Sequence, residues 1–595
     1  MAFPAFAQAS RITEVDPSLL IAKETVDEWF ASKNAWGPTY TGSPAWFSYM
    51  EFIESHLRDY GAVKIEKNRF PFERWFTTEY PDRSGWSLVS DGRPVDVASY
   101  ATQSGSTGAD GVTAPLILYD MSLPEEERPA TSELAGKIVV IRQAPYVGDG
   151  VTGAYSDYEY RTNGDTFGDI GVPVDPTVEA GYRNRDQFGQ AEQNRKLLER
   201  SGAVGHVAIL DMPPGAAIAG RQHSTPDRYD VPGLLVDRVN GVALMEDARA
   251  GKTATLVLKG QVEEDATAYQ LAAVLPGRDY GTPQDRAVLM ATHTDGPGLI
   301  QDSGALGILG VINYYAKLPQ NERPMSIFTY FDVRHFIAGT EDGAPYDYVE
   351  DHMEELAPWI AGGVVMEHIG GAQMRDDGER YEPTGLPMTT YINTYGNDLL
   401  VELAIKAVND STLERAQVTV GSMSGGVVFG RPGVNGRQQN DWKGSTFAKI
   451  LERMGGYPSW HITGDWPSSG YQAIPAIDRY RADVYLAQVA TGIELVGEMM
   501  TQDLTALNPD WGKISIAIMR ASDEAFANPA EATQQRDVLL AASKQVFGLV
   551  RAKKHDEAAA RLGELDAAVE DQVRGKDLDL ISGHIDSARA RLGSY

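Results

Sequence analysis

The sequence of 595 residues contains no cysteine. This absence excludes disulfide bonds, thiolate metal sites and cysteine nucleophiles, so only histidine, aspartate and glutamate side chains remain to hold a metal ion. There is also no run of about 18 apolar residues, so the sequence predicts no membrane span. Basic residues are scarce, with 53 Lys and Arg against 83 Asp and Glu and a net charge of −30. Nucleic acid is therefore not an expected partner, because phosphate binding depends on clustered basic side chains.

The composition that is present is typical of a globular protein, with 42% hydrophobic and 23% charged residues. The length is too great for one hydrophobic core and predicts several domains. The first residues, MAFPAFAQAS, resemble the small-residue end of a secretory signal. We therefore expect residues 1–14 to be a signal-peptide remnant and the protein to be periplasmic or secreted; the alternative is an Ala-rich tail.

Hydrophobic periodicity divides the rest of the chain into four segments. Apolar residues at helical spacing predict two helices near the start, and Gly61 is a natural stop for the second. Short apolar runs between Gly, Pro and Asp clusters then predict a β-rich insert. Farther on, continuous apolar strands alternate with helices, which predicts a mostly parallel sheet flanked by helices. The expected domains are an α/β domain at 15–65 and 263–505, the insert at 66–262 and a helical domain at 506–595.

The predicted strands of the α/β domain end in residues that can bind metal. The carboxyl ends of parallel strands meet at one edge of a sheet, where active sites of such sheets lie. Each residue alone has an ordinary structural explanation; Asp302, for example, precedes a helix and could be its N-cap. Their shared position favours a metal site. The residues are His293, Asp295, Asp302, His335, Glu367, His368, His461 and Asp465.

These residue types suit a particular chemistry. A carboxylate two residues after His293 can orient its imidazole, and a carboxylate such as Asp302 offers two oxygens that can bridge two cations. Bound zinc lowers the pKa of a water molecule to about 7 and polarises a carbonyl group, which is the chemistry of amide hydrolysis.

The order of these motifs resembles one family. HTD, DSG before a helix, FD plus two residues, an acid before Ile-Gly and HITGD are similar to the dinuclear zinc aminopeptidases, a family that includes glutamate carboxypeptidase II and the transferrin receptor. The resemblance extends to TGSPAWFSYMEFIESHLRDYGA and to a protease-associated insert around GKIVVIRQ. It implies the zinc-aminopeptidase-like α/β fold, a protease-associated insert, and a C-terminal helical domain through which the chain forms a homodimer.

The resemblance also implies roles for individual residues. His293 corresponds to a ligand of one zinc ion, Asp302 to the bridging carboxylate and Asp295 to the acid that supports His293. Glu367 stands at a ligand position, and His461 corresponds to the last ligand.

Two further acids are similar to substrate-side positions of the family. Asp465 is the last residue of HITGD, and Asp441 resembles the acid near the final strand. A turn-forming Asn-Asp pair is the alternative explanation of Asp441.

The stretch FTYFDVRHFIAG departs from the family pattern. The family has two glutamates after this strand, a general base and a metal ligand, whereas this chain has Arg334 and His335. Arginine stays protonated and has no acceptor, so Arg334 is not a general base. His335 can replace the lost ligand. The substitution raises the charge of the site by about two units, which disfavours a second dication. We therefore expect one zinc ion per chain, or another divalent cation in its place.

Three functions fit this pattern. In the first, the chain is a metal-dependent hydrolase of amide bonds in a small-molecule or peptide-like substrate, with His368, Asp465 or metal-bound hydroxide as base. In the second, Arg334 binds a substrate carboxylate or an oxyanion, and the substrate is another amide, an ester or a glycan derivative. In the third, the site is inactive and the protein is a binding module. The retention of His293, Asp302, Glu367 and His461 favours the enzymatic functions.

Overall fold

The computed structural model describes most of the chain. The described residues are 11–143, 158–161, 168–169, 187–219, 228–334, 348–352, 355–356, 359–395, 398–411, 413–420, 459–464, 474–502, 514, 517–518, 521–551 and 554–592. None of the helices within these ranges is both long enough and apolar enough to cross a membrane.

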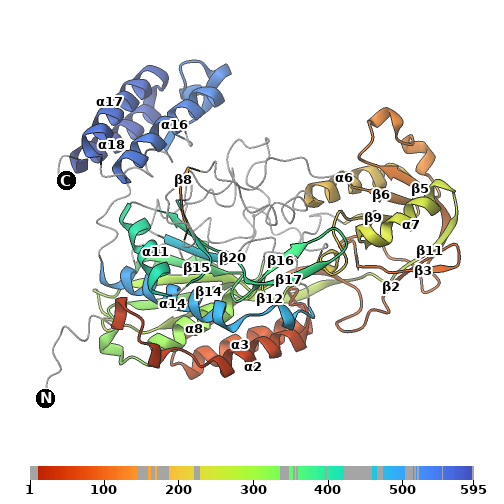
Figure 1. Ribbon diagram of the computed structural model, residues 1–595, viewed down its shortest axis with the longest axis horizontal. Helices are drawn as coiled ribbons and strands as arrows, with labels where there is room; N and C mark the ends of the chain where they lie inside the picture. The colour runs from red at the N-terminus through yellow and green to blue at the C-terminus, as the bar shows by residue number, and fades with distance from the viewer. Residues whose placement is uncertain are drawn as a thin grey trace.

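A ten-stranded sheet forms the centre of the molecule (Figure 1). Its four middle strands are parallel and lie in the order β14, β13, β15, β20. Every residue of β13, β14 and β15 is buried, as expected of parallel strands covered on both faces. The predicted α/β architecture is therefore confirmed. The bounds of the four strands are Ser326–Asp332 for β14, Ala287–His293 for β13, Ile360–Glu367 for β15 and Ser459–Gly464 for β20.

Six more strands extend this sheet on its two sides, mostly in antiparallel pairs. On one side, β12 pairs with β14 and β1 pairs with β12. On the other side, β18 follows β20, and β19, β7 and β8 continue the sheet. β7 and β8 come from the segment expected to form the insert. These strands are β1 (Val63–Phe76), β12 (Gln261–Leu275), β18 (Thr390–Tyr395), β19 (Ala416–Val420), β7 (Tyr158–Arg161) and β8 (Gly168–Asp169).

Helices cover the central sheet. α8 is buried almost throughout and packs on β13 and β15, with α14 and α3 packed against it. α2 and α3 are the two helices predicted near the start of the chain; the hydroxyl of Ser43 caps α3 by accepting from the Trp46 N–H at 3.1 Å. Figure 1 shows both of them along one edge of the molecule. The helices are α2 (Lys23–Trp36), α3 (Pro44–Asp59), α8 (Gly304–Ala316), α11 (Asp398–Asp410) and α14 (Ala482–Thr501).

A second sheet of eight strands lies at one end of the molecule. Its strand order is β3-β2-β11-β5-β6-β9-β10-β4, and β5, β6, β9 and β10 are parallel. The β-rich character predicted for this segment is thus confirmed, whereas its protease-associated identity and its boundaries stay predictions. The strands are β2 (Trp86–Ser90), β3 (Arg93–Val95), β4 (Ser99–Tyr100), β5 (Val112–Asp120), β6 (Ile138–Arg142), β9 (Gly205–Ile209), β10 (Gly233–Val236) and β11 (Thr253–Leu258), with helices α6 (Gln187–Glu199) and α7 (Arg238–Arg249).

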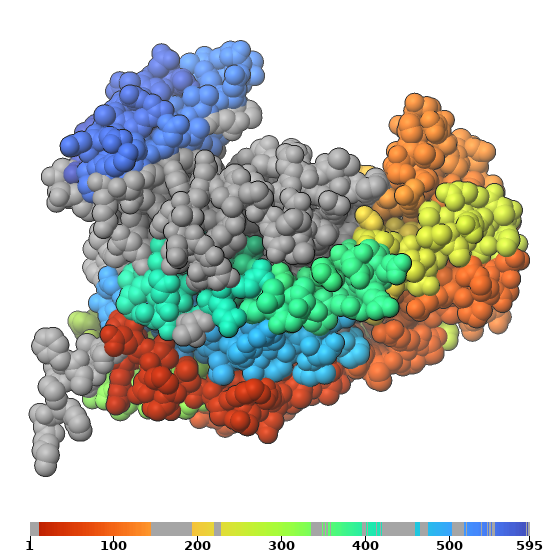
Figure 2. Space-filling model, viewed as in Figure 1, coloured from red at the N-terminus to blue at the C-terminus, as the bar shows by residue number. Residues whose placement is uncertain are grey.

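The C-terminal segment contains three long helices, α16, α17 and α18, which pack against one another. Figure 2 shows them, in blue, at the opposite end of this face from the strands of the eight-stranded sheet. The predicted helical character of this segment is confirmed. A two-stranded hairpin and a short helix lie elsewhere in the described part of the chain. The elements are α16 (Ala532–Arg551), α17 (His555–Gln572), α18 (Gly575–Leu592), the hairpin strands β16 (Ala372–Asp376) and β17 (Tyr381–Pro387), and the short helix α9 (Tyr348–Asp351).

Candidate metal centre

The carboxyl ends of the parallel strands bring three histidines around one carboxylate. β13 ends at His293, β15 ends at Glu367 with His368 directly after it, and β20 carries His461. His293 Nε2 lies 3.1 Å from one carboxylate oxygen of Glu367, and His461 Nε2 lies 3.1 Å from the other. One ligand atom each from His293, Glu367 and His368 lie within 4.8 Å of one another. All four residues are buried.

Hydrogen bonds orient two of these rings. His293 Nδ1 lies 2.9 Å from the backbone carbonyl of Asp295 and 3.8 Å from its carboxylate. His368 Nδ1 lies 3.2 Å from the Thr463 hydroxyl and 3.4 Å from the Gly464 carbonyl. Metal-binding histidines in proteins commonly donate one ring N–H to such an oxygen, which leaves the other nitrogen for the metal. Asp295 thus lies beside His293, with its backbone carbonyl nearer than its carboxylate, and its role as a supporting acid stays a prediction.

The electrostatics of this group centre on Glu367. Burial alone would lower the pKa of His293, but the hydrogen bond and negative charge of Glu367 raise it to about 9. Burial opposes ionisation of Glu367, yet its hydrogen bonds to His293 and His461 hold its pKa well below the ordinary value. Burial lowers the pKa of His368 to about 4. In the absence of metal, the group therefore contains a carboxylate, a protonated His293 and a neutral His368.

The backbone at His368 has an unusual conformation. Its φ is +52°, in the left-handed region that residues other than glycine rarely adopt. Such a conformation costs about 1–3 kcal/mol and is concentrated at functional sites. Because Glu367 and His368 are adjacent, an extended backbone would direct their side chains to opposite faces of the strand. The left-handed turn instead places both side chains in one group.

The donors and their spacing fit a divalent metal ion. Two imidazoles and one carboxylate form a donor set that catalytic zinc sites use, with a further position left open. Atoms bound tetrahedrally to zinc at about 2.0–2.1 Å lie about 3.3 Å apart. The contact between His293 Nε2 and the Glu367 carboxylate, at 3.1 Å, is close to that spacing.

Asp302, expected as a bridging carboxylate, is bonded on both of its oxygens. Lys33 Nζ donates to Oδ1 at 2.9 Å, and the Thr39 hydroxyl donates to Oδ2. Asp302 and Lys33 are completely buried. The alternative explanation of Asp302 as a helix cap is not observed, since α8 begins after Ser303 without a side-chain cap. The charge of Asp302 still contributes to the raised pKa of His293, so the two residues interact electrostatically.

Arg334, expected to contact the substrate or an oxyanion, lies beside Asp332. Its Nε and Nη2 atoms donate to the two carboxylate oxygens of Asp332 at 2.9 and 3.2 Å. Both side chains are buried. Asp332 is also the partner of His293 in the register between β14 and β13, so the ion pair adjoins the candidate metal centre. Three other expected site residues, His335, Asp441 and Asp465, lie outside the described residues.

Lys33 is the residue of this site that the sequence prediction missed. It lies on α2 at helical spacing from Val26, Trp29 and Phe30, all of which are buried. A lysine in register with an apolar helix face is a recognisable sequence signal, because lysine is almost never fully buried unless it is paired. Its partner, 269 positions away, could not be identified in this way.

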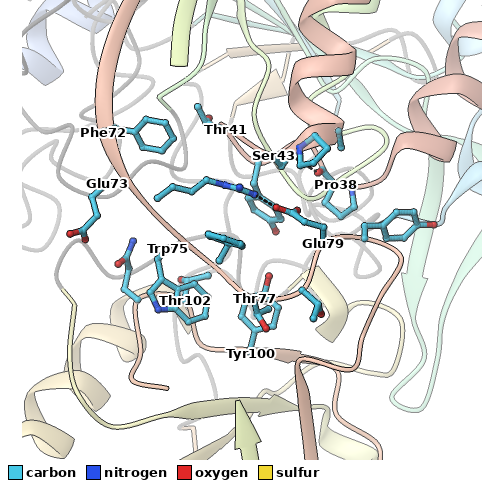
Figure 3. A pocket seen from close by; sticks show the side chains of 18 of the residues that line it. Pro38, Thr41, Ser43, Phe72, Glu73, Trp75, Thr77, Glu79, Tyr100 and Thr102 are labelled. Carbon is cyan, nitrogen blue, oxygen red and sulfur yellow. Dashed lines mark hydrogen bonds and ion pairs between the residues drawn. The ribbon is translucent and has the colours of Figure 1, made fainter. Parts of the chain in front are cut away.

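The loop that carries Thr39 also lines a cleft of about 130 Å³. Figure 3 shows the aromatic side chains of Phe72, Trp75 and Tyr100 around it. Thr41, another lining residue, donates its hydroxyl to the carbonyl of Val333 at 2.6 Å. The cleft wall therefore contacts the residue that lies between Asp332 and Arg334 in the sequence.

Comparison with known proteins identifies the fold. No protein-family model and no curated protein matches the sequence. The crystal structure of a peptidase M28 precursor from Shewanella amazonensis SB2B is similar, with a TM-score of 0.53 and 14% identity over 84% of this chain and 96% of that chain. BSAP, a zinc aminopeptidase from Bacillus subtilis, has a TM-score of 0.46 and 15% identity over 83% and 94% of the chains. An aminopeptidase from Aneurinibacillus sp. strain AM-1 has a TM-score of 0.45 and 15% identity over 82% and 95%.

The similarity to the Shewanella structure confirms the predicted aminopeptidase-like α/β fold. A fold is compatible with many activities, so the function has to be argued from the residues of the site.

Proposed function

We propose that this chain is a metal-dependent hydrolase of amide bonds that holds one divalent ion, zinc by preference, on His293, Glu367 and His368. The observation that carries the proposal is the buried group of these three residues, with ligand atoms within 4.8 Å of one another. His461, the fourth member, contacts the second oxygen of Glu367. Zinc in such a site activates water and polarises a carbonyl group.

The protein residues prepare this site in three ways. Backbone and hydroxyl oxygens hold the rings of His293 and His368, so that the rings lose little freedom when a metal binds. Burial keeps the His368 imidazole neutral, as a ligand must be. Glu367 supplies the negative charge that a dication requires, and His293 gives up the proton that balances this charge in the metal-free protein.

The cleft beside Thr41 is the proposed contact surface for the substrate. It combines aromatic side chains with the ion pair between Arg74 and Glu79, and binding pockets commonly combine such apolar walls with a few polar groups (Figure 3). The Thr41–Val333 hydrogen bond joins it to the strand end beside the metal centre. Export of the protein and dimerisation through the C-terminal helices remain parts of this proposal that rest on the sequence alone.

Metal analysis tests the proposal first. The protein is stripped with a chelator, incubated with Zn²⁺, passed through a desalting column and analysed for metal. We expect about one ion per chain, and at least a hundredfold weaker binding in His293→Gln and His368→Gln variants. His584→Gln, in α18, is the matched control and should bind zinc like the wild type. A folded wild-type chain that retains no zinc would contradict the proposal.

Activity on a panel of aminoacyl and γ-glutamyl amides tests the hydrolase assignment separately. Turnover that requires added metal and is lost in His368→Gln would support it. A second function, binding without hydrolysis, is favoured by one observation: Asp302 and Asp332 are both committed to basic partners, so neither is a ready general base. A chain that binds zinc and leaves every amide and ester intact would favour that second function.

A further inference from the structure

We propose that the Lys33 ammonium group occupies the place of a second metal ion and so limits the metal centre to one ion. This inference rests on the proposed metal site for the first ion. It concerns a side chain that lies on α2, outside the strand ends, and that contacts the site through a completely buried ion pair.

The surroundings of the Lys33 ammonium are those of a hard cation. Nζ donates to the Gly298 carbonyl at 2.8 Å and to the Asp302 carboxylate at 2.9 Å. It also lies 5.1 Å from the centre of the Tyr49 ring, which favours a positive charge over its face. The Thr39 hydroxyl donates to the other Asp302 oxygen. The carbonyl and carboxylate oxygens that Lys33 contacts are of the kind that Ca²⁺, Mg²⁺ and Mn²⁺ prefer as ligands.

This oxygen-lined position adjoins the metal centre. Asp302 and Gly298 belong to the loop that runs from His293, at the end of β13, to the start of α8. Thr39 pairs with Gly296 of the same loop through backbone hydrogen bonds of 2.8 and 3.2 Å. The loop is therefore fixed between the metal centre on one side and Lys33 on the other.

The charge of Lys33 explains why one ion is sufficient. A buried carboxylate needs a compensating positive charge, and breaking a buried ion pair by removal of one partner is strongly destabilising. With Lys33 in place, Asp302 is already neutralised and both of its oxygens are engaged. A second dication at this position would have to displace the ammonium, whose side chain belongs to α2 and is completely buried.

Removal of the ammonium should convert its position into a cation site. In Lys33→Met the side chain keeps a similar length without charge, and in Lys33→Gln it keeps a hydrogen-bond donor without charge. Each variant and the wild type are stripped with chelator and titrated with Zn²⁺ and then with Mn²⁺ in a calorimeter, with metal analysis of the same samples. We expect one ion per chain in the wild type and two in both variants, with the second ion preferring Mn²⁺.

A matched double variant identifies the ligand. Lys33→Met combined with Asp302→Asn removes both charges, and we expect its stoichiometry to return to one. Folded single variants that both still take one ion would overturn the proposal, as would a double variant that retains two. If the wild type takes no metal while the single variants take one Mn²⁺, the proposed function fails and the role of Lys33 stands. The measurement reads stoichiometry, so it is independent of whether any substrate is hydrolysed.

Discussion

His206 and His293 are buried histidines on the middle one of three parallel strands, in two different sheets. His206 is the second residue of β9, between β6 and β10, and His293 is the last residue of β13, between β14 and β15. Burial lowers the pKa of His206 to about 4, whereas Glu367 raises that of His293 to about 9. The two positions differ in which end of the strand they occupy.

At the carboxyl ends of parallel strands, loops from several strands bring polar side chains together. The first residues of a strand lie at the other end of the sheet, away from these loops. His206 accordingly packs against backbone: a Cβ atom on Gly233 would lie 1.9 Å from its ring. His293 instead faces a carboxylate at 3.1 Å. Burial of a histidine is therefore a weak indication of function, and burial beside an acid at a strand end is a stronger one.

Removal of that acid should have the largest effect. Glu367→Gln takes away the only charged donor of the proposed site, so we expect zinc affinity to fall at least a hundredfold, which corresponds to about 3 kcal/mol. Asp247→Asn is the matched control, since Asp247 is a carboxylate of the eight-stranded sheet region that pairs with Arg93 and Lys252. Competition with a chromophoric chelator measures both affinities. Equal zinc affinities in Glu367→Gln and Asp247→Asn would contradict the proposal that only the central-sheet carboxylate holds the metal ion.

His206 should make the protein sensitive to acid. Its pKa is depressed in the folded protein from 6.5 to about 4, so the unfolded state binds the proton first as pH falls. The contribution of neutral His206 to the free energy of unfolding is complete above pH 6.5 and is lost as the pH falls from 6.5 to 4. A pKa shift of this size corresponds to about 3 kcal/mol.

Urea unfolding of the wild type and of His206→Leu at pH 7 and pH 4.5 measures this contribution. Lowering the pH from 7 to 4.5 should reduce the free energy of unfolding of the wild type more than that of His206→Leu. A difference that is the same at both pH values would show that His206 does not titrate in this range.

His293 should have the opposite pH dependence in the metal-free protein. Its folded pKa is raised from 6.5 to about 9, so its contribution is complete below pH 6.5 and is lost as pH rises through about 9. Chelator-treated wild type and His293→Gln are compared by urea unfolding at pH 6 and pH 9.5. We expect the free energy of unfolding of the wild type to exceed that of the variant by less at pH 9.5 than at pH 6. A larger excess at pH 9.5 would contradict a protonated His293 in the metal-free protein.

The sequence predicted the parts of this site that depend on local pattern. Continuous apolar runs ending in His or Glu identify β13 and β15, and parallel strands necessarily bring their ends together. The left-handed backbone at His368 was not predictable, because no glycine or asparagine indicates it. His368 was expected among the strand-end residues and as a candidate base, and the structure shows the backbone conformation that groups its side chain with those of His293 and Glu367.

The parts that were missed depend on contacts between distant segments. Lys33 and Asp302 are 269 positions apart, and only the packing of α2 beside the loop before α8 brings them together. The pairing of β19 with β7 likewise joins the central sheet to a segment of the expected insert. Neither contact can be read from a periodic pattern in the sequence. In particular, the strand β7 is too short to show an alternation of apolar and polar residues.

The smallest expected effect concerns a buried aspartate of the second region. The Asp237 carboxylate accepts from the backbone N–H groups of Val239 and Asn240, both at 2.8 Å, and so caps α7. Asp237→Ala should lower the free energy of unfolding by about 1 kcal/mol, and Asp237→Asn, which keeps an acceptor, by less. Urea unfolding measures the change, and zinc titration should give the wild-type stoichiometry. With that result, the buried carboxylate of Asp237 affects stability alone, in contrast to that of Asp302. Altered zinc uptake in Asp237→Ala would instead mean that the two regions are coupled. The coupling would run through β1 and β12, the strands that connect the two sheets.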